Sequence, residues 1–317
     1  MSGQGTAPLV AVIATGGTIA SRRGADGAST PSLSGEDLLA LVPQVNARLK
    51  PVDLMAKDSS SLTLADMQRI SDAVGIELSD PAVAGIVVLH GTDAMEESSL
   101  LVHLQHALPK PVVFTGAQFT ADHRQADGPA NLARAIETAL DQQNAEKGVL
   151  LSFGGRCLPA WGLYKLSADA ADAFRSARPQ VNVTAPKLAA PVTDIRVDIV
   201  AIHPGCDATH IDASLAAGAK GIVLAALGSG NANPLIAEAV KRCAERRVPV
   251  VVSSRVPEGL LVASYGGGGG GHDLVAAGAV HSSTLRPGQA RILLAALLAG
   301  NSSAETIVSA FGEPLSH

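Results

Sequence analysis

Short apolar runs that alternate with helix-like stretches constrain the fold of this chain more than any other feature. The runs are nearly continuous apolar segments, as is typical of strands covered on both faces. Their alternation with helical stretches predicts a mostly parallel α/β sheet. The expected strands are Leu9–Ala14, Val52–Ala56, Gly85–His90, Pro111–Thr115, Gly148–Phe153, Val197–His203, Gly221–Leu227 and Val248–Ser253.

Helix start signals mark three of the intervening stretches. Ser34 precedes the segment GEDLLALV, and Thr63 lies three residues before Asp66. Asp127 precedes a stretch that has Pro129 in its first turn. Such residues can accept a hydrogen bond from a free backbone N–H, and proline is favoured in the first turn. The sequence therefore predicts helices that begin at these three places.

A proline-spaced segment, Ala177–Asp194, interrupts the alternation and has no helical period. It predicts a connection between two α/β domains. We expect a larger N-terminal domain at residues 1–185 with a mostly parallel sheet, a linker at 186–196, and a smaller parallel-sheet domain at 197–317. Within the second domain, the glycine run Gly266–Gly271 is expected to be a flexible loop, because glycine packs no core and costs much entropy to order.

The composition excludes several classes of protein. Apolar residues make up 47% and charged residues 17% of the 317 residues, as in a globular chain. The net charge of −5 without a long basic run argues against nucleic acid or an anionic membrane as the partner. The start of the chain lacks a basic region, so we expect a cytoplasmic protein. The three scattered cysteines predict neither a disulfide framework nor a zinc site, and buried structural thiols are expected.

Polar clusters follow several of the expected strands at the point where each strand ends. TGGT (Thr15–Thr18), DSSS (Asp58–Ser61) and GTD (Gly91–Asp93) follow strands of the N-terminal domain, and GSGN (Gly228–Asn231) follows a strand of the C-terminal one. The carboxyl ends of parallel strands share one edge, where ligands bind. The three N-terminal clusters are therefore predicted to meet in one crevice. The helices after them would suit an anion such as a carboxylate.

The TGGT segment admits two interpretations from its residues. It can be a strand-to-helix turn in which a threonine caps the helix. A phosphate-binding loop is disfavoured, because the segment matches neither G-x-x-x-x-G-K-[ST] nor G-x-G-x-x-G. In the catalytic interpretation a threonine hydroxyl is the nucleophile, which requires neighbours that activate it, since the free alcohol is a poor nucleophile.

The segment LHGTDAMEE, which contains Thr92 and Asp93, also has two interpretations. Thr92 or Asp93 can cap the following helix with Glu96 as the partner in a capping box. Alternatively, Asp93 binds a substrate ammonium or holds a lysine. Lys165 is a lone lysine among apolar and small residues: it is either a surface lysine or, if burial depresses its pKa, a neutral base.

Four motifs stand in a fixed order along the chain: ATGGTIAS, LHGTDAMEE, ADGPANL and SSRVPEG. With these motifs the chain resembles the bacterial-type L-asparaginases, including the glutaminase-asparaginases, from near residue 9 to near residue 315. The resemblance implies a two-domain α/β protein that hydrolyses the side-chain amide of asparagine through a threonyl acyl-enzyme. It also implies the absence of metal and cofactor, and a homo-oligomer, a dimer of dimers with sites between paired subunits.

The resemblance assigns roles to particular residues. Thr18 corresponds to the nucleophile, and Thr92, Asp93 and Lys165 correspond to the group that activates hydroxyl or water. Thr15 corresponds to a supporting hydroxyl. The positions implied to contact the substrate are Gly17, Ser59, Ser60, Thr92, Asp93 and Asn231, of which Ser59 and Ser60 hold the α-carboxylate, Asp93 meets the α-ammonium, and Asn231 comes from the neighbouring subunit.

The chain departs from the family in the lid that follows TGGT. Family members carry a tyrosine there, whereas the region Arg22–Gly35 has none, and the tyrosines of this chain are Tyr164 and Tyr265. Ser29, Thr30 or Tyr265 are the candidate replacements. The alternatives to an asparaginase are a catalytically weakened amino-acid-binding member, or an enzyme that prefers glutamine, a D-amino acid or a small peptide amide. A tRNA-dependent amidotransferase is disfavoured.

Overall fold

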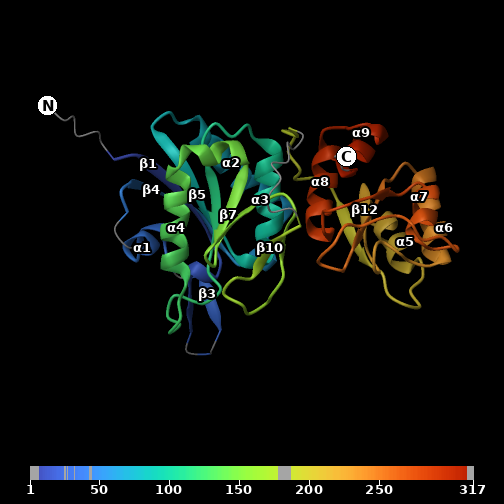
Figure 1. Ribbon diagram of the computed structural model, residues 1–317, viewed down its shortest axis with the longest axis horizontal. Helices are drawn as coiled ribbons and strands as arrows, with labels where there is room; N and C mark the ends of the chain where they lie inside the picture. Colours follow the sequence, from blue (N-terminus) through green and yellow to red (C-terminus); the bar gives the residue numbers. More distant parts are fainter. Residues whose placement is uncertain are drawn as a thin grey trace. The chain divides into compact units, whose positions relative to one another are not determined.

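The computed structural model describes residues 7–24, 26, 28–31, 33–42, 45–177 and 187–312. The chain divides into two compact units, Met1–Ala185 and Pro186–His317. Part of the predicted connection, residues 178–186, lies outside the described residues. This part includes residue 185, where the first domain is predicted to end. Each unit contains a main sheet of its own (Figure 1).

The N-terminal unit is built on a six-stranded sheet in the order β4-β1-β5-β6-β7-β8. All neighbouring strands are parallel except β7 and β8, which are antiparallel. Each of the five strands expected in this unit is present, and β8 is an additional edge strand. The strands are β1 (Leu9–Gly16), β4 (Arg48–Lys57), β5 (Val83–Leu89), β6 (Val112–Thr115), β7 (Val149–Phe153) and β8 (Arg156–Pro159).

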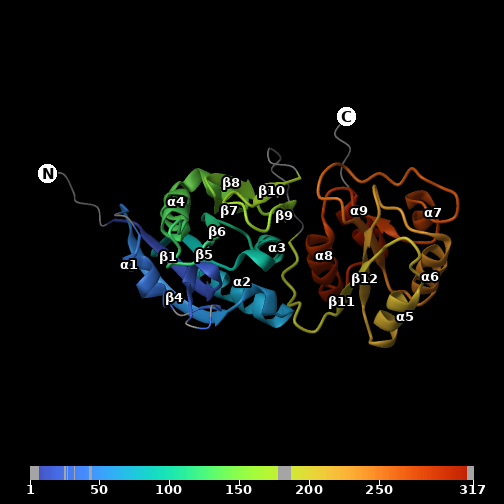
Figure 2. The same cartoon turned by 90° about the horizontal axis from the view of Figure 1, so that it is seen from below.

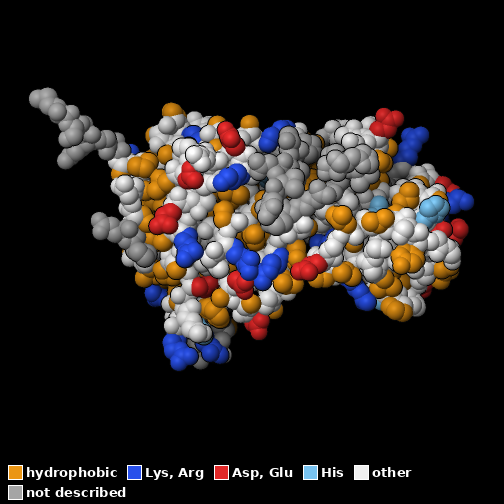
Figure 3. Space-filling view, viewed as in Figure 1, with side chains coloured by type: hydrophobic (Ala, Val, Ile, Leu, Met, Phe, Trp, Pro, Cys, Tyr) orange, Lys and Arg blue, Asp and Glu red, His pale blue; other side chains and the backbone are white. Residues whose placement is uncertain are grey.

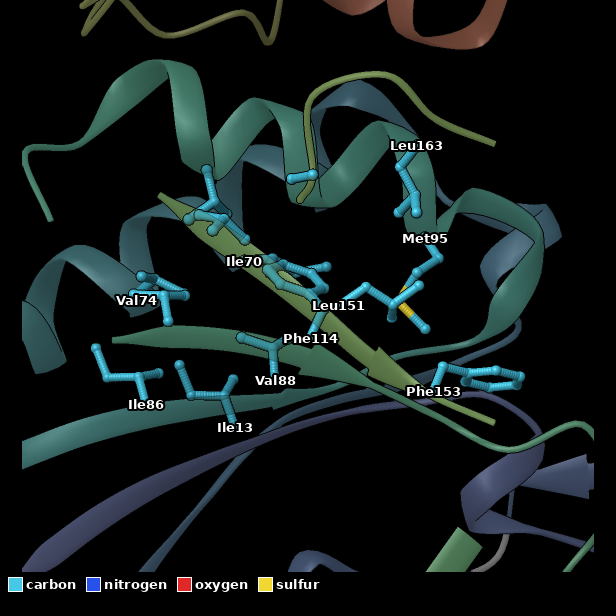
Figure 4. Packing of buried hydrophobic residues seen from close by; sticks show 14 of the residues in the cluster. Ile13, Ile70, Val74, Ile86, Val88, Met95, Phe114, Leu151, Phe153 and Leu163 are labelled. Atoms are coloured by element: carbon cyan, nitrogen blue, oxygen red, sulfur yellow. The ribbon is translucent and has the colours of Figure 1, made fainter. Parts of the chain in front are cut away.

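Helices cover both faces of this sheet (Figure 2). On one face, Ile70 and Val74 of α2 (Leu64–Ser79) and Met95 of α3 (Met95–Gln105) pack on the sheet, and Figure 4 shows them above Ile13, Val88 and Phe114. On the other face, α1 (Gly35–Ala40) and α4 (Gly128–Leu140) cover a second core. The strands read as continuous apolar runs because both of their faces are buried.

The predicted helix starts are all present, but only two are capped as expected. Ser34 and Thr63 form capping boxes with Asp37 and Asp66. Asp127 precedes α4 without capping it. Its carboxylate instead accepts hydrogen bonds from the backbone N–H groups of Gln118 and Phe119, at 2.9 to 3.1 Å, and so holds the loop after β6.

Short strands outside the main sheet carry parts of the site. The lid region forms an antiparallel hairpin of β2 (Ser21–Arg23) and β3 (Ser29–Pro31). A second antiparallel pair joins β9 (Leu163–Lys165) and β10 (Phe174–Ser176). These strands have three residues each, which is too short for an apolar periodicity to indicate them.

The C-terminal unit contains a four-stranded, all-parallel sheet in the order β11-β12-β13-β14. The two-domain α/β fold class predicted from the sequence is confirmed. The strands are β11 (Val197–Ala201), β12 (Gly221–Ala226), β13 (Val250–Ser254) and β14 (Val280–His281). The helices are α5 (Thr209–Ala216), α6 (Pro234–Glu245), α7 (Gly271–Ala276), α8 (Pro287–Ala299) and α9 (Ala304–Phe311).

One expectation about a residue type is wrong in part. Cys206 and Cys243 are buried, but Cys157 is exposed because it lies on the edge strand β8. In the glycine run Gly266–Gly271, Gly268 N and Gly270 N donate to Asp273 Oδ2 at 2.7 and 3.0 Å, and the flexibility expected of this run stays a prediction. Among the described residues, no helix is long and apolar enough to cross a membrane.

Candidate active site

The TGGT segment ends strand β1, which lies between β4 and β5, and turns sharply into the 3₁₀ helix η1 (Thr18–Ala20). Gly16 and Gly17 have φ angles of 102° and 80°, which other residues rarely adopt. Gly17 N donates to Lys57 O at 3.1 Å, which fastens the turn to the end of β4. The turn therefore presents Thr18, which is partly buried, at the carboxyl edge of the sheet. Among the described residues, no hydrogen bond engages the Thr18 hydroxyl.

The two motif-bearing turns touch each other through glycines. Gly91, which follows β5, lies so close to Gly17 that a Cβ on Gly17 would collide with Gly91 Cα and N. A Cβ on Gly91 would lie 2.5 Å from Ser59 Oγ. The backbones of the three polar clusters thus meet beside one another, because β4, β1 and β5 are adjacent parallel strands. The predicted convergence of the three clusters is confirmed.

Thr92, Asp93 and Lys165 form one hydrogen-bonded group. Lys165 Nζ lies 2.8 Å from Thr92 Oγ1 and 2.9 Å from Asp93 Oδ1, and it donates to both. The Thr92 side chain is buried, whereas the side chains of Lys165 and Asp93 are 22% and 59% exposed. The second carboxylate oxygen of Asp93 makes no hydrogen bond within the described part of the chain. An acceptor for an external cation therefore lies beside a lysine and a hydroxyl.

Thr92 and Asp93 do not cap the helix that follows them. They lie in the 3₁₀ helix η3 (Thr92–Ala94), and the residue before α3 is Ala94, which makes no side-chain capping bond. Glu96 does not complete a capping box either, because its Oε2 accepts a hydrogen bond from Lys165 N at 2.8 Å. The capping interpretation of this motif is therefore wrong.

Ser59 and Ser60 lie in the 3₁₀ helix η2 (Ser59–Ser61), which packs on η3. Ser59 is buried, and its Oγ accepts a hydrogen bond from Asp93 N at 3.1 Å. Ser60 is exposed. Ser59 thus fixes the backbone at Asp93, and its neighbour offers a hydroxyl at the surface of the same group.

Two buried residues support the turns from behind. Thr15 Oγ1 donates to Leu89 O at 2.8 Å and joins β1 to β5 just before the two turns. His90 Nδ1 lies 2.6 Å from Gly91 O, so this nitrogen carries the proton and donates to the carbonyl. Complete burial lowers the pKa of His90 to about 4, which keeps the ring neutral at neutral pH.

The hairpin β2–β3 begins directly after η1 and is anchored at its base. Ala121 N donates to Ser21 O at 3.1 Å, and Arg23 N donates to Asp122 Oδ2 at 3.0 Å. Thr30 lies on β3 opposite Arg22, and its side chain is exposed. Figure 3 shows basic side chains over this hairpin, in agreement with its exposed arginines.

Two of the sequence candidates lie in the C-terminal unit. Asn231 ends the turn after β12, and its Oδ1 accepts a hydrogen bond from Gly271 N at 3.1 Å. Ser254 Oγ donates to Gly228 O at 2.6 Å and holds the start of the same turn. The side chain of Tyr265 is 63% exposed.

Sequence reasoning missed the Gly17–Gly91 contact and the bond between Glu96 and Lys165. A glycine directly before Thr92 was the available signal for the contact, since glycine permits close approach of backbones. The Glu96 bond joins residues 69 positions apart and left no local signal. Within the described ranges, no group of three or more His, Cys, Asp or Glu side chains could hold a metal ion.

Comparison with known proteins places this geometry in a family. The model of the asparaginase N-terminal domain matches residues 9–190, and that of the glutaminase/asparaginase C-terminal domain matches residues 196–311. The chain belongs to the asparaginase family. Its resemblance to bacterial-type asparaginases, predicted from four motifs, is therefore confirmed.

The similarity to relatives and to a solved structure extends over nearly the whole chain. A probable L-asparaginase of Deinococcus radiodurans is 35% identical and covers 96% of this chain and 97% of its own length. L-asparaginase 2 of Escherichia coli is 28% identical, covering 96% and 93%. The crystal structure of a probable cytoplasmic L-asparaginase from Campylobacter jejuni has a TM-score of 0.84 and 27% identity, covering 96% and 99%.

Proposed function

We propose that this protein is an L-asparaginase, an amidohydrolase that converts L-asparagine into L-aspartate and ammonia. One observation carries the proposal: Lys165 Nζ donates to both Thr92 and Asp93 at the sheet edge where the TGGT turn presents Thr18. This group combines a nucleophilic hydroxyl, a proton-transfer chain and a carboxylate, which amide hydrolysis through an acyl-enzyme requires. The relatives that carry the name L-asparaginase support the same activity.

In the proposed mechanism, Thr18 Oγ1 attacks the carbonyl carbon of the side-chain amide and forms a tetrahedral oxyanion. The C–N bond then breaks, the nitrogen takes up a proton and leaves as ammonia, and an aspartyl ester with Thr18 remains. Water attacks this ester and releases aspartate and the free hydroxyl. Lys165 and Thr92 would move the protons, because the Thr92 hydroxyl accepts from Lys165 and can donate its own proton onward.

Substrate binding is assigned to groups around the same edge. The free carboxylate oxygen of Asp93 would bind the α-ammonium, and the backbone of Gly17 with the hydroxyls of Ser59 and Ser60 would bind the α-carboxylate. Asn231 would reach the substrate from a neighbouring subunit of a dimer of dimers. Fixing both charged ends of the substrate would make the attack by Thr18 an oriented step.

The lid gives one reason to keep a second candidate. The region Arg22–Gly35 has no tyrosine to contact Thr18, and Thr30 on the hairpin has an exposed hydroxyl that could take its place. Without a replacement, the protein would bind the amino acid but turn it over slowly. This second candidate is a weakened amino-acid-binding member of the family.

Ammonia release from asparagine and from glutamine, with calorimetric binding of each, separates the two candidates. We expect ammonia release from asparagine at saturating concentration, with glutaminase activity as a smaller side reaction. Binding of asparagine without ammonia would favour the second candidate. A faster reaction with glutamine, a D-amino acid or a peptide amide would change the assigned substrate while keeping the reaction type.

The assembly and location are also part of the proposal. Sedimentation should show a homo-oligomer, and an Asn231→Ala chain mixed with a Thr18→Ala chain should recover activity if subunits share sites. A cytoplasmic location is inferred from the Campylobacter jejuni protein of that name. Cell fractionation would test it directly.

A further inference from the structure

Glu96 uses its carboxyl in a way that the proposed reaction does not explain. It lies in the first turn of α3, where an acidic residue ordinarily interacts with its own helix N-terminus. Instead, its Oε2 accepts a hydrogen bond from the backbone N–H of Lys165 at 2.8 Å. The bond therefore joins the start of α3 to the last residue of β9, from which the Lys165 side chain extends.

Strand β9 is too short to fix the Lys165 side chain by itself. It has three residues and pairs with the equally short β10, where Lys165 lies opposite Phe174. Leu163, at the other end of β9, is buried in the core next to Met95 (Figure 4). The first residue of the strand is thus held by apolar packing on α3, and the last by the hydrogen bond to Glu96.

The Lys165 ammonium needs that support because its two hydrogen bonds can form together only at one position of the nitrogen. Nζ must stay 2.8 Å from Thr92 Oγ1 and 2.9 Å from Asp93 Oδ1 at the same time. A lysine side chain has many rotamers, so the position of its backbone decides whether both bonds can form. Thr92 and Asp93 directly precede α3, the helix that carries Glu96. Thr92 and Asp93 are thus connected to α3 through the chain, and the Glu96 bond connects the backbone of Lys165 to the same helix.

We propose that Glu96 is a positioning residue for the reaction: its carboxyl holds the end of β9 against α3 and thereby places Lys165 between Thr92 and Asp93. The inference rests on the proposed function of Lys165 and names a residue that acts through it. Glu96 itself is assigned no contact with substrate.

The charge state of Glu96 gives this role a measurable signature. Its side chain is partly buried, and desolvation raises its pKa to about 7. Of the charged groups that act on it, Glu97 on α3 raises the pKa further, whereas the Lys165 ammonium on β9 opposes this. A carboxylate accepts a stronger hydrogen bond than a neutral carboxylic acid. The tie between α3 and β9 should therefore tighten as the pH rises through about 7.

The test compares Glu96→Leu with Glu96→Gln. Leucine removes the acceptor, and we expect kcat to fall by about tenfold or more with a much smaller change in KM, because a displaced catalytic group mainly affects the transition state. Glutamine keeps an acceptor but does not titrate. It should restore most of kcat, and the rise in kcat near pH 7 that we expect of the native protein should be absent.

Glu97→Gln is the matched control on the same helix turn. It leaves the Glu96 bond in place and removes a charge that raises the pKa of Glu96, so the rise in kcat should move to lower pH instead of disappearing. Native kcat in Glu96→Leu, or a native pH profile in Glu96→Gln, would overturn the proposal.

Misfolding of Glu96→Leu and failure of the proposed role of Lys165 can each be distinguished from a failure of the Glu96 proposal. If Glu96→Leu does not fold, the pH profiles of Glu96→Gln and Glu97→Gln decide the question. If Lys165→Met retains full activity, the proposed function of Lys165 fails, and it fails independently of any result at position 96.

Discussion

The Lys165 group of the N-terminal unit and the Asn231 turn of the C-terminal unit are built in opposite ways. In the first, charged and hydroxyl side chains bind one another, with Lys165 donating to Thr92 and Asp93. In the second, the backbone N–H of Gly271 holds the Asn231 side chain, and Ser254 Oγ donates to the backbone of the same turn at Gly228 O. The first region depends on charge and the second on backbone shape.

This difference predicts how each region responds to substitution. A charge cluster loses its chemistry when one member is removed, since the partners are left without a counter-charge. A backbone-held side chain keeps its orientation when surrounding side chains change, provided that the donor N–H remains. Substitutions should therefore affect kcat strongly in the Lys165 group and modestly at the Asn231 turn.

The largest effect is expected at Thr18. Thr18→Ala removes the proposed nucleophile, so ammonia release from asparagine should fall by at least about 1,000-fold. Circular dichroism and thermal unfolding should stay close to native, because the Thr18 hydroxyl makes no hydrogen bond among the described residues. Near-native turnover in this variant would refute the assignment of the nucleophile.

Lys165→Met should follow, with a loss of about 100-fold or more in kcat and a smaller change in KM. Methionine keeps most of the side-chain length but cannot donate to Thr92 or Asp93. Lys147→Met is a suitable control, since that lysine binds Asn144 on η4 (Gln142–Lys147) instead of the site. A rise in KM alone would show that Lys165 binds substrate and does not take part in proton transfer.

Glu96 makes the stability of the charged region depend on pH. Its pKa is raised in the folded protein from 4.5 to about 7, because burying the carboxylate costs more than its stronger hydrogen bond to Lys165 N returns. Its contribution to the free energy of unfolding is therefore fully present below pH 4.5 and is lost as the pH rises through about 7, although the hydrogen bond itself strengthens. Relative to Glu96→Gln, the native protein should lose on the order of 2–3 kcal/mol of stability between pH 4 and 8. Urea unfolding of both proteins at the two pH values measures this difference.

The Asn231 turn should give smaller effects on activity. Asn231→Ala removes one proposed uncharged contact to the substrate, and we expect kcat/KM to fall by about tenfold, within the range of a single neutral hydrogen bond. A loss as large as that of Lys165→Met would show that the two regions do not differ in the way proposed.

The smallest effect on kcat/KM is expected from loss of the backbone N–H of Gly271. Gly271→Pro and Gly271→Ala both add a Cβ, which would lie 3.0 Å from Ala263 Cα, but only proline removes the N–H that binds Asn231. Proline suits the first position of a helix, where Gly271 lies. The proline variant should have a kcat/KM about threefold below that of the alanine variant. Equal values would mean that this hydrogen bond does not orient Asn231.

The main sheets could be predicted from the sequence because their signal is local. Strands buried on both faces are apolar throughout, and the polar clusters at their ends fall on one edge of a parallel sheet. The convergence of Thr18, Ser59 and Thr92 follows from that topology alone. The capping boxes of Ser34 and Thr63 were equally local, since donor and acceptor lie three residues apart.

The parts that could not be predicted depend on distant or backbone contacts. Glu96 looked like a capping residue because its true partner, Lys165, lies on a strand of three residues without a pattern of its own. Asp127 looked like a cap because nothing in the sequence indicates that its carboxylate binds the loop at Gln118. Composition likewise does not reveal that Asp273 accepts hydrogen bonds from two N–H groups of the glycine run.

The contact between Gly17 and Gly91 also sets the terms on which this sequence can vary. Neither position has room for even a methyl group, because a Cβ on Gly17 would meet the Gly91 backbone and a Cβ on Gly91 would meet the Ser59 side chain. A replacement at one position has no compensating replacement at the other, since neither residue can become smaller. In a library of random variants, the folded members should therefore keep glycine at position 17 and at position 91. Segments recombined from relatives should be tolerated only if they also carry glycine at the corresponding position.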